Sequence, residues 1–155
     1  MRSANSEPGP APKRTPSAEI QSFDFYDPAR EATPSLKRAR ALAERPGASI
    51  ARDKIPLNDG ALDLCLTIFA AHEIRQDAER VAFFREIARV LAPTGRALVV
   101  EHLRDGWNFL AYGPGFCHFF SRKSWQRSFA DAGLKLVREE ASTPFVRVFE
   151  LGRQP

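Results

Sequence analysis

The stretch "LDLCLTIFAAHE", residues 62–73, decides which fold this 155-residue chain is expected to adopt. Apart from one Asp and one Thr it is apolar until His72, and a continuous apolar run predicts a strand buried on both faces, as in the middle of a parallel sheet. The run ends abruptly in His72 and Glu73, an imidazole beside a carboxylate. These two residues either cap the end of a core element or lie at the mouth of an active site, where strands of an α/β sheet lead into loops.

The residues that follow repeat this order of elements. Residues 77–93, "DAERVAFFREIARVLAP", place apolar side chains along one stripe and predict an amphipathic helix with Asp77 as its N-cap. Residues 96–103, "RALVVEHL", predict a second buried strand, which also ends in an acid and a histidine, Glu101 and His102. A strand, a helix and a strand in this order indicate a parallel sheet flanked by helices.

The C-terminal part of the chain predicts a different kind of pairing. Residues 121–134, "SRKSWQRSFADAGL", predict a helix with Gly133 as its C-terminal cap. Residues 135–140 and 145–152 then predict two strands, and the short connection between them requires antiparallel pairing. The expected fold is therefore α/β, with an antiparallel strand pair at its C-terminal end.

The N-terminal part divides into a polar segment and the start of the domain. Residues 1–19, "MRSANSEPGPAPKRTPSAE", are rich in proline and predict a disordered or extended segment. The domain is expected to cover residues 20–155, with a first strand that ends near residues 23–25. A helix is expected over residues 35–45 and a short strand over residues 48–53.

Composition excludes several classes of function. The net charge is only +4, because 23 basic residues face 19 acidic ones and the two are interspersed, which argues against a nucleic-acid partner. No apolar stretch reaches the roughly 20 residues that a membrane helix needs, so no membrane partner is expected. The two cysteines, Cys65 and Cys117, form no disulfide framework, and Cys65 is expected to be a buried thiol. This usage suits a reducing, cytoplasmic location.

Four stretches together resemble a known family. They are "FDFYDP" at 23–28, "ARDKIPLNDGALDL" at 51–64, "AFFREIARVLAPTGRALVVEH" at 82–102, and the closing helix with its antiparallel pair. In order and spacing they resemble class I S-adenosylmethionine-dependent methyltransferases of the methyltransferase-domain type, over residues 21–151. The resemblance implies a Rossmann-like sheet with helices on both faces, S-adenosylmethionine as the cofactor, and methyl transfer to a small-molecule acceptor.

The resemblance also implies residues that would bind the cofactor. Asp24, with Asp27 as second choice, matches the acid that accepts from both ribose hydroxyls, a task that needs a carboxylate at a strand's carboxyl end. Asp53 matches an acceptor for the adenine amino group, and Phe25 and Ile55 could enclose the adenine ring. The alternative for Asp24 and Asp27 is a solvated strand end, and for Asp53 a helix or turn cap.

The carboxyl end of the 62–71 strand is where the family places the reacting methyl group. Phe69 and Ala70 would then back the cofactor, while His72 and Glu73 would face the acceptor. Much of the catalysis of methyl transfer can come from alignment of the two reactants. A base is needed only where the acceptor must lose a proton, and His72 is the first candidate, with His102 as the second. The alternative is that both histidines are polar strand ends held by backbone hydrogen bonds.

The segment after the second strand, "WNFLAYGPGFCHFF" at 107–120, is expected to lie over the pocket. Asn108, Tyr112 and His118 could contact an acceptor there. The alternative is a packed aromatic cap with a turn. No metal is expected, because the three histidines show no ligand spacing along the sequence.

The family's strongest motif has no counterpart in this sequence. A Gly-rich loop should precede Asp24, but the prolines of residues 1–16 bar that segment from a central strand. The family's first strand and helix are therefore expected to be missing, through truncation, through a second chain that supplies them, or through degeneration of the domain; truncation is favoured. Thr94 stands where the family usually has Gly, and Pro93-Thr94-Gly95 still predicts a type I turn.

Three functions remain open from the sequence. The first is a methyltransferase acting on a small molecule. The second is a truncated or degenerate methyltransferase-like domain that acts as an interaction module and self-associates through an exposed sheet edge. The third is a nicotinamide-dependent oxidoreductase, which also uses an acid after its second strand but lacks support from the terminal antiparallel pair.

Overall fold

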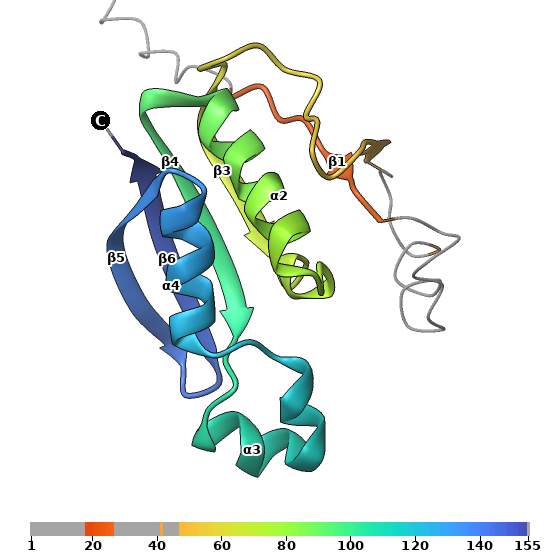
Figure 1. Ribbon diagram of the computed structural model, residues 1–155, viewed down its shortest axis with the longest axis vertical. Coiled ribbons are helices and arrows are strands. Elements are labelled where there is room, and N and C mark those ends of the chain that lie inside the picture. The colour runs from red at the N-terminus through yellow and green to blue at the C-terminus, as the bar shows by residue number, and fades with distance from the viewer. Residues whose placement is uncertain (1–17, 27–40, 42–46, 155) are drawn as a thin grey trace, which may run out of the picture.

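A four-stranded sheet forms the centre of the protein in the computed structural model, which describes residues 18–26, 41 and 47–154. Its strands, in spatial order, are β3 (Leu62–Ile68), β4 (Leu91–His102), β6 (Val146–Arg153) and β5 (Leu134–Thr143). β3 and β4 pair in parallel, and β6 pairs antiparallel with both β4 and β5 (Figure 1). The α/β class and the antiparallel closing pair are thereby confirmed.

A second, two-stranded sheet joins β1 (Phe23–Asp24) to β2 (Ala48–Ser49) in parallel. The strand predicted near residues 23–25 is confirmed, and the one predicted over 48–53 is shorter than expected. The predicted helix over 35–45 and the polar segment over 1–17 lie outside the described residues, apart from Ala41. Phe25 fastens the small sheet to the rest, because its ring packs 4.8 Å from the ring of Phe83.

Two helices cover one face of the four-stranded sheet. They are α2 (Asp77–Val90) and α4 (Arg122–Asp131), which lie side by side in front of the strands (Figure 1). Their aromatic side chains form the core: the ring of Phe84 lies 4.9 Å from that of Phe129, which packs 5.4 Å from Phe149 of β6. We call the face of the sheet beneath these two helices the covered face. Trp125 is fully buried on it.

The opposite face of β3 remains exposed. Leu64, Leu66 and Ile68 are 52%, 56% and 56% exposed, and we call this surface the open face. The prediction that this strand is buried on both faces was therefore wrong for the described part of the chain. The physical reason is that β3 lies at the edge of its sheet and both described long helices pack on the other side.

Three short elements lie at the carboxyl ends of β3 and β4. They are η1 (Ala71–Glu73), α3 (Gly106–Tyr112) and η2 (Gly113–His118). β4 points directly at α3 (Figure 1). Because the carboxyl ends of parallel strands meet at one edge of a sheet, this edge collects the loops that follow β3 and β4.

The structure confirms the predicted C-terminal cap of one helix and corrects two other local predictions. Gly133 adopts φ +79° after α4, as its predicted capping role requires. Asp77 is not the N-cap: Gln76 occupies that position, and the Asp77 carboxylate pairs with Arg80. The predicted turn at 93–95 is instead extended within β4, where Gly95 is needed because a Cβ would lie 2.7 Å from the carbonyl oxygen of Leu62.

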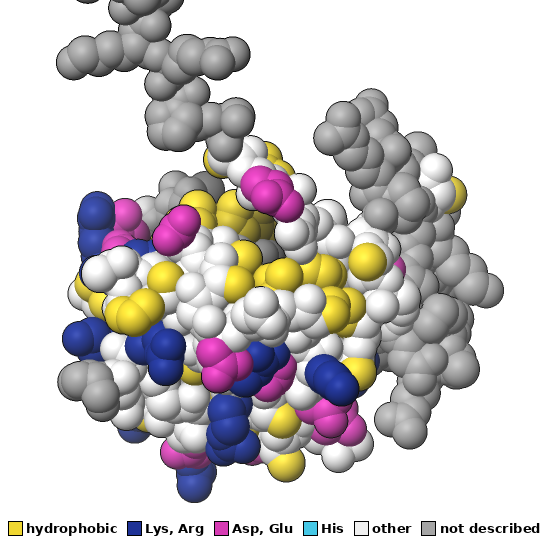
Figure 2. All heavy atoms as spheres, turned by 90° about the horizontal axis from the view of Figure 1, so that it is seen from above, with side chains coloured by type: hydrophobic (Ala, Val, Ile, Leu, Met, Phe, Trp, Pro, Cys, Tyr) yellow, Lys and Arg dark blue, Asp and Glu magenta, His cyan; other side chains and the backbone are white. Residues whose placement is uncertain are grey.

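The surface carries both charges in mixture. On the side seen in Figure 2, Lys and Arg side chains lie among Asp and Glu, with hydrophobic patches between them. No helix within the described ranges combines the length and the apolarity that crossing a membrane requires.

Candidate functional site

The candidate site begins where the chain leaves β3. Phe69 adopts φ +50°, a conformation uncommon outside glycine, and its backbone N–H donates to the carbonyl of Val100 at 2.9 Å. This sharp bend directs the chain into η1, which carries His72 and Glu73. A strained, non-glycine residue directly after a strand is typical of functional sites in α/β folds.

The central feature of the site is a buried pair between His72 and Glu101. Nδ1 of His72 lies 2.7 Å from Oε2 of Glu101, and the backbone N–H of His72 donates to Oε1 at 3.2 Å. Glu101 is fully buried in β4. Because an ionised carboxylate only accepts hydrogen bonds, the Nδ1 atom carries the proton, and Nε2 faces away from Glu101 toward the loops.

This environment changes the acid–base behaviour of His72. Burial of the ring lowers its pKa, but the hydrogen bond to Glu101 and the negative charges of Glu101 and Glu73 outweigh burial, so the pKa is raised above its usual value. Sequence reasoning did not select Glu101 as a site residue. The available signal was an acid inside the otherwise apolar strand "ALVVEH".

Glu73 and His118 complete a cluster around the outer nitrogen of His72. Oε1 of Glu73 lies 3.3 Å from Nε2 of His72 and 3.4 Å from Nε2 of His118. The two imidazole rings are edge to face, 5.3 Å apart. Arg75 donates to the backbone carbonyls of both His72 and His118, which ties η1 to the end of η2. The fold thus brings together two predicted acceptor contacts and the first candidate base.

The second candidate base, His102, lies in a separate aromatic cluster. Its ring stacks on Phe69 at 4.8 Å and lies 5.2 Å from the ring of Tyr112. Nδ1 is 2.9 Å from the carbonyl of Phe145, and Nε2 is 3.4 Å from the hydroxyl of Tyr112. Successive residues of a strand point to opposite faces, so Glu101 and His102 face apart. The catalytic role of His102 stays a prediction.

Two predicted acceptor contacts lie on α3. Asn108 is fully buried, and its side-chain amide donates to the carboxylate of Asp105 and to the carbonyl of Phe145. Tyr112 is about half exposed. Both remain predicted acceptor contacts, and in this conformation Asn108 also holds α3 against the β5–β6 turn.

The predicted cofactor residues follow three different strands: Asp24 and Phe25 lie at the end of β1, Asp53 and Ile55 in the loop between β2 and β3, and Phe69 and Ala70 after β3. Asp24 ends β1, and its carboxylate accepts from the backbone N–H of Tyr26 at 3.0 Å. The side chains of Phe25 and Ile55 are buried, whereas Asp53 is exposed. These four residues and the backing pair Phe69 and Ala70 stay predictions as cofactor contacts.

Tyr26 connects the small sheet with the cluster around His72, a link that sequence reasoning missed. Burial is the main cause that raises the pKa of Tyr26 to about 12, and the negative charges of Glu73, Glu101 and Asp24 contribute to the same rise. These acids therefore lie near the phenol. The end of β1 and the ends of β3 and β4 thus face one region of the molecule.

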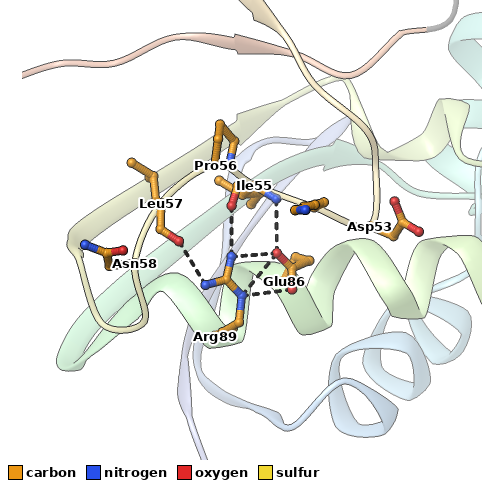
Figure 3. Close-up of a pocket in the computed structure, with 8 residues that line it drawn as sticks. Asp53, Ile55, Pro56, Leu57, Asn58, Glu86 and Arg89 are labelled. Carbon is orange, nitrogen blue, oxygen red and sulfur yellow. Dashed lines mark hydrogen bonds and ion pairs between the residues drawn. The ribbon is translucent and has the colours of Figure 1, made fainter.

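A shallow pocket of about 480 Å³ lies beside α2 and contains two of the predicted adenine contacts, Asp53 and Ile55 (Figure 3). The side chains of Arg89 and Glu86 in this pocket are already paired. Arg89 donates to the carbonyls of Ile55 and Leu57 at 2.8 and 2.9 Å, and Glu86 accepts from the backbone of Ile55 at 3.0 Å. This network holds the loop before β3 against α2. The His72 cluster therefore remains the candidate site for the chemistry, and Asp53 and Ile55 remain predicted cofactor contacts.

Comparison with known proteins supports this assignment of the fold. A family model described as "Methyltransferase domain" matches residues 27–99. A solved S-adenosylmethionine-dependent methyltransferase from Aquifex aeolicus superposes with a TM-score of 0.60 at 18% identity, covering 83% of this chain and 65% of that one. The fold is that of a class I methyltransferase domain.

Other solved structures share this methyltransferase fold. A putative type 11 methyltransferase from Sulfolobus solfataricus superposes with a TM-score of 0.59 at 16% identity. The match covers 86% of this chain and 69% of the Sulfolobus chain. The mitomycin 7-O-methyltransferase MmcR superposes with a TM-score of 0.57 at 21% identity. The match covers 77% of this chain and 37% of the MmcR chain. The chain thus spans less than two thirds of the Aquifex protein and little more than a third of MmcR. None of the curated proteins compared with the chain matches it.

Proposed function

We propose that this methyltransferase domain transfers a methyl group from S-adenosylmethionine to a small-molecule acceptor, with His72 as the general base. The observation that carries the proposal is the buried His72–Glu101 pair. It lies at the carboxyl ends of two adjacent parallel strands, which is where open α/β sheets bind their ligands.

The nucleoside half of the cofactor would be held by residues that follow β1 and β2. Asp24, at the end of β1, would accept from the ribose hydroxyls, and Asp53, an exposed carboxylate in the loop after β2, would accept from the adenine amino group. Phe25 and Ile55 would flank the adenine, and Phe69 with Ala70 would back the rest of the molecule. When bound, S-adenosylmethionine supplies a methyl group on a positively charged sulfur.

The chain's own residues would prepare the acceptor for this transfer. Nε2 of His72 takes the proton from an acceptor hydroxyl, thiol or amine, while Glu101 holds the ring through Nδ1 and stabilises the imidazolium that forms. Glu73 and His118 border the same nitrogen and would position the acceptor. His102 and Tyr112 of the neighbouring aromatic cluster, together with Asn108 of α3, would contact the acceptor from the other side.

The surface beside the cluster favours a small apolar or aromatic acceptor. Trp107, Phe109 and Leu110 of α3 are all at least half exposed at the carboxyl end of β4. Apolar side chains with a few polar groups are typical of small-molecule sites. A cytoplasmic location is part of the same proposal, and the two free thiols, Cys65 and Cys117, support it.

A thermal melt and a transfer assay test this proposal separately. S-adenosylhomocysteine at about 100 times its dissociation constant should stabilise the 155-residue chain by roughly 2.7 kcal/mol. Transfer of labelled methyl groups to a panel of phenols, thiols and amines should then fall about 10²–10⁴-fold in His72→Gln and Glu101→Gln. Arg127→Gln, on the exposed side of α4, is the matched control and should retain full activity. A cooperative melt that S-adenosylhomocysteine does not shift would contradict the proposal.

The open face of β3 favours a second candidate function, an interaction module that self-associates. Leu64, Leu66 and Ile68 form an exposed apolar row on an edge strand, and such edges pair readily with another chain. Sedimentation velocity should then show concentration-dependent dimers that Leu66→Lys abolishes. A monomer at every concentration would exclude this function.

A further inference from the structure

The cluster of His72, Glu73 and His118 has the spacing of a metal centre. One ligand atom from each residue lies within 4.8 Å of the other two. A tetrahedral zinc ion with bonds of about 2.0–2.1 Å separates its ligand atoms by roughly 3.3–3.4 Å. The two contacts of Glu73 Oε1, at 3.3 and 3.4 Å, already match that separation. Only the two imidazole nitrogens need to move closer, by at most about 1.4 Å.

The hydrogen-bonding capacity of the cluster calls for a cation at its centre. Nδ1 of His72 donates to Glu101, so Nε2 of a neutral ring presents a lone pair. That lone pair faces Oε1 of Glu73, a second acceptor. Two acceptors at this distance repel each other unless a proton or a metal ion lies between them. The same Glu73 oxygen also faces His118, so one cation could satisfy all three side chains.

The surroundings support the three side chains as ligands. Glu101 binds the far nitrogen of His72, which is the carboxylate–histidine arrangement that orients a metal-binding imidazole. Arg75 fixes the backbone of both histidines. With neutral imidazoles, the two carboxylates and one guanidinium leave a net charge of −1, which favours a divalent cation.

We infer that His72, Glu73 and His118 bind a divalent transition-metal ion, with Zn²⁺ the expected occupant. Two imidazoles and one carboxylate are a typical catalytic zinc set, and they leave a fourth position open. This role rests on the proposed function: an acceptor hydroxyl or thiol would bind there as its anion, releasing its proton to water. In the metal-loaded protein the ion would favour the deprotonated acceptor, and Nε2 of His72 would act as the general base only in the metal-free protein.

Metal titration tests the inference without any activity assay. The full chain, stripped with a chelator, is titrated with Zn²⁺ in a calorimeter and with Co²⁺ in a spectrometer, where tetrahedral Co²⁺ gives visible absorption. All variants carry Cys117→Ser, because this exposed thiol adjoins His118 and could bind zinc by itself. We expect one ion per chain, in wild type and in Cys117→Ser alike.

Single substitutions then identify the ligands. His72→Ala, Glu73→Ala and His118→Ala should each weaken affinity at least about 100-fold, and Glu101→Gln should weaken it about 10–100-fold. His102→Ala is the matched control, because both of its ring nitrogens already have partners, and its affinity should stay within about twofold. His118 is about half exposed, so its variant should fold normally, which a metal-free melt verifies.

The outcomes separate this inference from the proposed function. No binding in wild type, loss of binding in Cys117→Ser alone, or an equal loss in His102→Ala would each overturn the metal site. Zinc binding without any shift by S-adenosylhomocysteine would leave the metal site standing and remove the proposed function. Methyl transfer that is equally fast in chelator and in zinc would leave the His72 base and overturn the role of the metal in the reaction.

Discussion

The two faces of the sheet differ sharply although the same strands form both. On the covered face, Phe84, Trp125 and Phe149 are completely buried. On the open face, the three apolar side chains of β3 are more than half exposed. The difference shows that an apolar strand indicates how much surface can be buried, whereas the packing of distant helices decides which face is buried.

The largest expected effect tests this contrast directly. Phe84→Ala should lower the free energy of unfolding by about 3–5 kcal/mol, because it leaves a cavity between α2, α4 and the sheet. Leu66→Ala, on the open face, should lower it by less than about 1 kcal/mol. Urea unfolding followed by tryptophan fluorescence measures both. Equal losses would show that the open face is buried in solution.

A somewhat smaller effect is expected at Arg80, which joins the two covering helices. Its buried guanidinium donates to Ser128 and to the carbonyl of Ile74 and lies 3.9 Å above the ring of Phe120. Arg80→Ala should cost about 2–3 kcal/mol, since it leaves a buried carbonyl unpaired and removes the packing of the stem. Asp77→Asn should cost less than about 0.5 kcal/mol because Asp77 is largely exposed. Similar costs would show that the ion pair, and not the packing, matters.

A pH-dependent effect is expected at Glu86, on the side of α2 that holds the loop before β3. The hydrogen bond from Arg89 lowers the pKa of Glu86 below its ordinary value of 4.5. Its stabilising contribution is therefore complete above pH 4.5 and is lost as the pH falls through the folded-state pKa.

Glu86→Gln tests that contribution. The substitution should cost about 1–2 kcal/mol at pH 7, and the difference from wild type should shrink in acid. Urea unfolding at several pH values measures the difference. A cost that stays constant down to pH 3 would contradict the role of the charge.

The smallest effect concerns thiol reactivity. Cys65 points toward the covered face, and burial raises its pKa to about 11, whereas Cys117 is exposed in η2. Iodoacetamide at pH 8 should therefore alkylate Cys65 at least about tenfold more slowly than Cys117. Peptide mass spectrometry measures both rates. Equal rates would mean that the edge strand β3 opens often.

The fold was largely predictable because its signals are local. The apolar stripe of α2 and the short link between β5 and β6 lie within single segments of sequence. The predictions that failed concerned features that neighbouring segments determine. Which face of β3 is buried depends on the helices that cover it, and the extended path through Gly95 depends on the close approach of Leu62. No local pattern contains these contacts.

The candidate site was predictable only in part. His72 and Glu73 stood out because they end an apolar run. Treating His72 and His102 as equivalent strand ends overlooked the alternation of a strand, by which Glu101 faces His72 and His102 faces away. The approach of His118 to Glu73 joins segments far apart in the sequence, which ligand spacing along the chain cannot anticipate.

The position of β6 constrains how the sheet can form while the ribosome is still making the chain. β6 lies between β4 and β5 but is the last described strand to be synthesised. Until residues 146–153 leave the ribosome, β5 has no strand to pair with, and the far edge of β4 is bare. Such unpaired edges promote aggregation. Newly made chains should therefore depend on chaperones until translation has passed β6, and a ribosome stalled between β5 and β6 should yield an aggregation-prone intermediate.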